Sequence, residues 1–139
     1  KAFGYDLKRM FAYKVSSIGT ITASSTLSPE YDVNNLFDPD ENKTWKPAPD
    51  DKEPELTITL SEKDMFNRVL MMEHIKNGQH VEEYELYLDK GDGKMKKLDK
   101  GGIVGYKRIH KVTPTDIVKL KIKFTSIRGE LEMQEVALY

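Results

Sequence analysis

Strict alternation of apolar and polar residues is the feature that most limits what this chain can fold into. In the segment 55–60 (ELTITL), Leu56, Ile58 and Leu60 alternate with polar residues. The segment 117–124 (IVKLKIKF) has the same rhythm, with lysines between its apolar residues. Successive side chains of a strand point to opposite faces, so both segments predict strands with one buried face and one face in water.

Three further segments predict strands. The segment 81–88 places Tyr84, Leu86 and Leu88 on one side, and 66–72 is apolar almost throughout, which is typical of a strand buried on both faces. The segment 131–138 predicts a closing strand with a bulge where the alternation slips after Met133. The only helical pieces that we expect are short, at 6–12 and 31–37.

Turn chemistry separates these segments. The sequence Lys90-Gly91-Asp92-Gly93 supplies residues that accept positive φ, so it predicts a hairpin between the flanking strands. Three prolines make 46–54 a loop. Short strands at regular spacing predict an all-β fold, an antiparallel β-sandwich.

Composition excludes several classes of function. The 139 residues suffice for one ordinary domain, and 22 basic against 23 acidic residues leave a net charge of −1. A near-neutral chain argues against nucleic acid and membrane surfaces as partners, because both need a basic face. The absence of cysteine excludes disulfides and thiolate chemistry. The three histidines lack the H-E-x-x-H spacing of zinc hydrolases, and no G-x-S-x-G or Walker motif is present.

Two groups of motifs resemble known families. Residues 21–25 (ITASS), 35–40 (NLFDPD) and Trp45 resemble the opening of discoidin domains, also called coagulation factor V/VIII type-C domains, whose fold includes the family-32 carbohydrate-binding modules. Residues 66–69 (FNRV) through Glu73 to Val81, and 105–109 (GYKRI), resemble the discoidin-like domain that follows the catalytic barrel in bacterial family-29 α-L-fucosidases.

This resemblance implies a jelly-roll-like sandwich of about eight strands over residues 20–139, preceded by a lead-in segment or linker, 1–19, from another domain. It implies a non-catalytic accessory module, because the fucosidase carboxylates lie in the barrel. Its partners would be fucose- or galactose-containing glycans, bound weakly through loops, and the neighbouring catalytic domain. It also implies a periplasmic or extracellular location. Two alternatives stay open: a purely structural docking domain, and an adhesion domain that binds protein or lipid.

The resemblance further implies a structural Ca²⁺ ion near an acidic turn. The matching ligands are the carbonyls of Asn35 and Asp40 and the carboxylates of Asp38 and Glu135. The family usually has Thr two residues before the Trp; this chain has Lys43 there, its Thr is Thr44, and Pro39 replaces a Gly. Either the Lys43 ammonium replaces the cation by pairing with Asp38, or the turn is rebuilt so that Thr44 still contributes.

Six residues are candidates for sugar contacts: Tyr31, Trp45, Glu73, His74, Gln79 and Arg108. Aromatic rings stack on the C–H face of a pyranose, and the polar groups match hydroxyls that both donate and accept. Each has a structural alternative. Trp45 is expected to pack in the core, while Glu73 and Gln79 would hold their loop by bonding backbone amides.

Arg108 has alternatives of its own. Strand alternation places Ile109 inward and Arg108 on the other face, with Tyr106 and His110. From there it would grip paired hydroxyls, form an ion pair with Glu73 or Glu85, or contact the catalytic barrel.

Overall fold

The structure is a computed structural model that describes Val15 and residues 17–139. The expected helical piece at 6–12 lies outside the described residues. Six antiparallel strands carry the fold: β1 (Ile18–Ala23), β2 (Glu55–Glu73), β3 (Val81–Asp89), β4 (Lys96–Gly101), β5 (Arg108–Ile127) and β6 (Met133–Leu138). Three short 3₁₀ turns complete it: η1 (Pro29–Tyr31), η2 (Val33–Phe37) and η3 (Ile75–Asn77). The first two account for the helical turn expected at 31–37.

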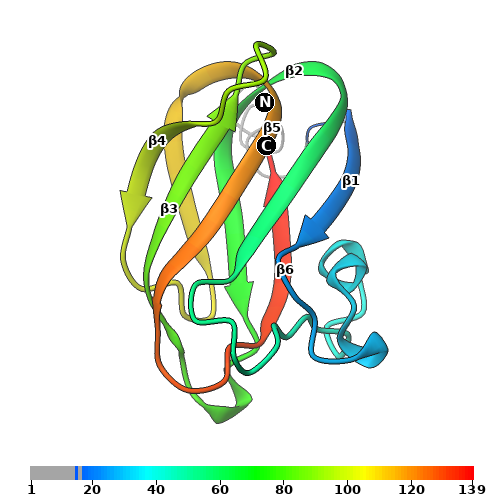
Figure 1. Cartoon of the computed structure of the whole chain (residues 1–139), viewed down its shortest axis with the longest axis vertical. Helices are drawn as coiled ribbons and strands as arrows, with labels where there is room; N and C mark the ends of the chain where they lie inside the picture. The colour runs from blue at the N-terminus through cyan, green and yellow to red at the C-terminus, as the bar shows by residue number, and fades with distance from the viewer. Residues whose placement is uncertain (1–14, 16) are drawn as a thin grey trace, which may run out of the picture.

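β2 and β5 are long strands that bend, so that each contributes one half to each layer of the sandwich. The strand order is β1-β2-β5-β3-β4, with β6 paired to β2. The β2–β5 register breaks between Thr59 and Asp64. Before the break β2 pairs with β1, and after it with β6. Figure 1 shows β2 turning over at the top of the view, so one hydrogen-bonded sheet folds into a sandwich. Counting both halves of the two bent strands gives eight segments, in line with the about eight strands that the resemblance implies.

The interior is built as the alternation predicts. Leu56 and Ile58 of β2, Leu120 and Ile122 of β5 and Leu86 of β3 are all fully buried. The hairpin of β3 and β4 forms at Gly91 and Gly93, whose φ values are positive. The bulge expected in the last strand is present: between Met133 and Glu135, β6 holds two residues against one in β2.

The predicted direction of residues 108–110 is wrong. His110 is buried and lies opposite the core residue Val69, whereas Ile109 packs on an outer cluster with Leu70 and Met72. The side chains still alternate between the two faces, but the inner and outer faces are the reverse of the prediction. Polar side chains turn inward here because other strands supply hydrogen-bond partners for them, as described below.

Most long connections gather at one end of the sandwich, which we call the loop end. The segments 24–54, 74–80, 102–107 and 128–132 lie at the bottom of Figure 1, where β2 ends and β3 begins. The bends of β2 and β5 and the β3–β4 hairpin lie at the opposite end. Val15 already joins the core, and its N–H donates to the Leu138 carbonyl (2.9 Å). None of the described helices has the length and apolar character of a membrane span.

Candidate functional site

Glu73 holds two connections of the loop end together. It is the last residue of β2 and has no exposed surface. Its carboxylate accepts hydrogen bonds from the backbone N–H groups of His80 (2.6 Å), Val81 (3.2 Å) and Gly105 (2.9 Å). The Glu73 N–H in turn donates to the Gly105 carbonyl (3.0 Å). Glu73 therefore lacks access to a ligand and acts through the loops that it fixes, as the structural alternative states.

One of these loops carries an exposed aromatic residue. Tyr106 follows Gly105, which has φ +65°, and 60% of its surface is exposed. It borders a hollow of about 250 Å³, which we call the Tyr106 hollow. The side chains of His74 and Ile75 line it from the loop after β2. The remaining lining residues are polar: Glu41, Asn42, Lys76 and Gln134. An apolar ring beside several hydrogen-bonding groups is the composition that a sugar needs.

A second hollow, of about 510 Å³, is bordered by Tyr31, and we call it the Tyr31 hollow. The Lys46 ammonium lies 4.8 Å from the centre of the Tyr31 ring and 3.9 Å from the Glu132 carboxylate. These contacts steady the ring from one side. The hollow is also lined by Glu30, Asn35, Asn42, Lys43, Thr44 and Glu132.

Trp45 is a core residue. It has no exposed surface, and its ring centroid lies 6.4 Å from that of Phe124. Its indole N–H donates to the Ser25 carbonyl (3.1 Å). Stacking on a sugar is not available to a ring without an exposed face.

The serines of the ITASS segment tie the loops to the sandwich. Both Ser24 and Ser25 donate to the Asp51 carboxylate at 2.6 Å. Ser24 also accepts from the Glu55 N–H, and Ser25 from the Ala48 N–H, each at 2.9 Å. The motif therefore helps to build the scaffold of the loop end.

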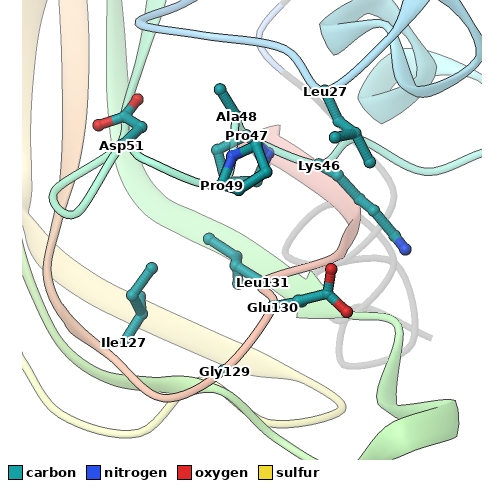
Figure 2. Close-up of a pocket in the computed structure, with 10 residues that line it drawn as sticks. All are labelled: Leu27, Lys46, Pro47, Ala48, Pro49, Asp51, Ile127, Gly129, Glu130 and Leu131. Carbon is teal, nitrogen blue, oxygen red and sulfur yellow. The ribbon is translucent and has the colours of Figure 1, made fainter.

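Figure 2 shows a third, smaller pocket, between the 46–51 loop and the chain after β5. It holds about 80 Å³, below the roughly 300–1,000 Å³ typical of small-molecule sites. Pro47, Pro49 and Leu131 line it, and the Asp51 carboxylate points away from them in the picture. The pocket is a packing gap between two loops.

The acidic turn is held by hydrogen bonds and an ion pair of the chain itself. Asp38 accepts from the Asp40 N–H (2.9 Å), and the Lys43 ammonium lies 3.3 Å from its carboxylate. The Asp40 N–H, followed by the Lys43 ammonium, holds the pKa of Asp38 below its usual value. The carbonyls of Asn35 and Asp40 accept backbone hydrogen bonds from Asp38 and Lys43.

Two further acids come from the chain at β6. Glu132 reaches this turn, where it accepts from the Thr44 hydroxyl at 2.6 Å. Glu135 lies on β6 opposite Met72. Among the described residues, no three acidic or histidine side chains form a group suited to a metal ion.

Arg108 belongs to a partly buried polar cluster whose members lie on β3, β4 and β5. Its guanidinium lies 5.8 Å from the centre of the Tyr84 ring, and Nη1 donates to the Ile103 carbonyl. Tyr84 Oη lies 2.5 Å from His110 Nδ1, and His110 Nε2 lies 2.8 Å from the Asp99 carboxylate. Since a carboxylate only accepts, Nε2 carries the hydrogen toward Asp99, and in the neutral imidazole Nδ1 then accepts from the Tyr84 hydroxyl. Burial raises the pKa of Tyr84, and the Arg108 charge offsets part of this rise.

The structure thus divides the predicted sugar-contact residues. Tyr31 and His74 border hollows at the loop end, whereas Trp45, Glu73 and Arg108 support the scaffold. Gln79 is exposed, but it lines neither hollow. Its side chain lies against Gly105: a Cβ atom added to that glycine would be 3.2 Å from the Gln79 Oε1 atom.

Among the hollow residues that were not predicted as sugar contacts are Asn42, Ile75, Tyr106 and Gln134. The exposure of Tyr106 has one sequence signal, its position directly after a glycine that breaks the preceding segment. The others come together only through the fold.

Comparison with known proteins gives a consistent result. A family model described as F5/8 type C domain matches residues 20–131. A GH29 fucosidase of Ruminococcus gnavus in complex with fucose is 25% identical over 99% of this chain, with a TM-score of 0.87. The chain spans 28% of that fucosidase.

Two carbohydrate-binding structures are more distant in sequence. The CBM32-1 and CBM32-2 domains of Clostridium perfringens ZmpB in complex with GalNAc are 19% identical (TM-score 0.79, 97% of this chain, 38% of that one). Chitosan-binding module 1 of a Paenibacillus sp. IK-5 chitosanase/glucanase is 15% identical (TM-score 0.80, 91% of this chain, 98% of that one). At these identities the likeness shows the fold alone. No curated protein matches the chain.

Proposed function

The chain belongs to the F5/8 type C (discoidin) domain family, and on that premise we propose that it is a non-catalytic accessory module that binds glycans weakly through its loop end. Fucose- and galactose-containing glycans are the ligands that we expect. The fucosidase neighbour in complex with fucose and the ZmpB neighbour in complex with GalNAc support this class of ligand. A periplasmic or extracellular location fits a glycan-binding module and is part of the proposal.

The Tyr106 hollow carries the proposal. It combines an exposed ring, an apolar Ile75 side chain that is 43% exposed, and polar groups on three separate segments. Because the site is open, little surface is removed from water on binding, and each neutral hydrogen bond contributes about 0.5–1.5 kcal/mol. Dissociation constants on the order of 0.1–1 mM are expected for single sugars.

An NMR titration of the chain with L-fucose, D-galactose and GalNAc tests this function. Backbone resonances of residues 74–76 and 105–107 should shift and saturate in the millimolar range. Tyr106→Ala should weaken binding at least about fivefold through loss of the stacking face. Met65→Ala is the matched control, because Met65 is 55% exposed at the opposite end of the sandwich. If no loop resonance shifts at high millimolar sugar, the chain has no lectin function.

Docking on a catalytic domain is a second candidate function. The R. gnavus fucosidase, which matches over nearly the whole of this chain, is more than three times as long as the matched part. We propose that this chain likewise belongs to a longer, fucosidase-like protein. The full reading frame tests this directly: a barrel domain with fucosidase-type carboxylates supports it, and an unrelated neighbour removes it.

A further inference from the structure

The two hollows of the loop end share their residues. Asn42 lines both of them. Its neighbours divide between the two, since Glu41 lines the Tyr106 hollow and Lys43 the Tyr31 hollow. On the other side, Gln134 lines the first and Glu132 the second. Two chain segments, 41–43 and 132–134, therefore each pass from one hollow to the other.

Hydrogen bonds join these two segments beneath the hollows. Trp45 and Met133 exchange both backbone hydrogen bonds, each at 2.9 Å. The Thr44 hydroxyl donates to the Glu132 carboxylate (2.6 Å), and the Asn35 amide donates to the Thr44 carbonyl (2.8 Å). The partners are far apart in sequence, and Trp45 is fully buried. The floor is thus formed before any ligand arrives, which lowers the entropic cost of binding.

We propose that the two hollows form one groove that takes an oligosaccharide of at least two units, with Tyr106 and Tyr31 as contacts at its two ends and Asn42 between them. The inference rests on the proposed function and names the form of its ligand. Glu132 and Gln134 are two residues apart in the chain, so their Cα atoms lie no more than about 7 Å apart. This offset is comparable with the length of one pyranose ring, so a single sugar occupies one hollow and a longer glycan reaches both.

The charges along the groove favour a neutral glycan. Glu30 and Glu132 accompany Lys43 in the Tyr31 hollow, and Glu41 accompanies Lys76 in the Tyr106 hollow. Neither end presents a field of one sign that would select a polyanion. The exposed carboxamide of Asn42 both donates and accepts, so it suits the hydroxyls of a sugar placed between the two rings.

Calorimetric and NMR titrations with L-fucose, lactose, 2′-fucosyllactose and lacto-N-tetraose test the groove. We expect at least one of the two larger oligosaccharides to bind about tenfold more tightly than L-fucose, because it adds a second aromatic contact and further hydrogen bonds. Its titration should shift resonances of both 29–31 and 105–107. Tyr31→Ala should remove most of this gain and leave binding of the single sugar within about twofold. Met65→Ala should change neither.

The outcomes separate the groove from the function. If single sugars bind and shift 105–107, but neither larger oligosaccharide gains affinity and 29–31 does not respond, the groove is refuted while the lectin function stands. If no saccharide of the series binds, both fail. Because loss of the Tyr31 ring could also loosen η1, Asn42→Ala provides a second test: Asn42 is an exposed side chain between the hollows. Retention of the full gain in both variants also overturns the groove.

Discussion

Glu73 and Asp38 are both carboxylates of the loop end, and their surroundings are opposite. Glu73 is fully buried and accepts hydrogen bonds from three backbone N–H groups of two connections. Asp38 lies on an exposed turn, with one backbone N–H and the Lys43 ammonium as partners. Water can replace the partners of Asp38 but not those of Glu73. The same chemical group therefore fixes the loops in one region and adjusts surface charge in the other.

The difference determines how the two hollows are held. The Tyr106 hollow depends on Glu73, because Gly105 is bonded to that carboxylate and to its backbone. The floor beneath Asn42 depends on the Trp45–Met133 backbone pair, which involves neither Asp38 nor Lys43. Perturbing the buried carboxylate should move a rim of the groove, whereas perturbing the exposed pair should leave both hollows in place.

Replacing Glu73 should give the largest effect. Glu73→Ala leaves three backbone N–H groups without an acceptor, and at about 1–3 kcal/mol for each buried unsatisfied donor the loss of unfolding free energy should reach at least about 3 kcal/mol. Urea denaturation measures this loss. The resonances of 102–107 should shift more than those of 29–37.

Glu73→Gln is the matched control, since its amide oxygen still accepts from some of these donors. It should be destabilised less than Glu73→Ala. Equal stability of the Ala variant and the wild type would show that water reaches these backbone groups, and the contrast with Asp38 would disappear.

The sequence predicted the layers and offered the loop-holding role of Glu73 as one of two alternatives, but it did not predict the polar cluster around His110. Alternation is a local signal, so it places Leu56 and Ile58 in the core from their own neighbours. The inward direction of His110 depends on Tyr84 and Asp99, which lie on other strands. A period of two residues gives two faces and does not say which is internal when both carry polar groups.

The hollows were beyond sequence reasoning for a related reason. Tyr31 and His74 were predicted as contacts because they lie on loops, yet Asn42 and Gln134 belong to the same surface only because Trp45 pairs with Met133. Such a pairing joins segments 88 residues apart along the chain, and no local pattern encodes it. Tyr106 lay within a recognised motif, but strand alternation grouped it with Arg108, whose side chain is held within the scaffold.

Asp99 is an intermediate case between the two carboxylates. About half of its side chain is exposed, yet it is bonded to the buried His110. This hydrogen bond, followed by that from the Lys100 N–H, lowers the pKa of Asp99 below its ordinary value of 3.8. A lowered folded-state pKa stabilises the protein at pH values above the ordinary one, and this contribution is lost as the pH falls through the folded-state pKa.

Asp99→Asn should therefore be less stable than the wild type at pH 6–7, with a difference that shrinks as the pH falls below about 4. Urea denaturation at a series of pH values measures the difference. Asp92→Asn, at an exposed residue of the β3–β4 hairpin, is the control and should not reproduce this pH dependence. A difference that stays constant from pH 7 to pH 3 would contradict the role of the Asp99 carboxylate.

The exposed pair should give the smallest effect. Without calcium, Lys43→Thr should shift the melting temperature by less than about 2 °C, because exposed ion pairs contribute little to stability. The pKa of Asp38 should rise only in part, since the Asp40 N–H is the larger cause of its lowering and is retained.

The variant also removes the ammonium from Asp38 and restores the residue that the discoidin resemblance implies. If Lys43 replaces a cation in the wild type, millimolar Ca²⁺ should raise the melting temperature of Lys43→Thr and leave that of the wild type unchanged. An equal rise in both proteins would contradict the idea that the Lys43 ammonium takes the place of a cation.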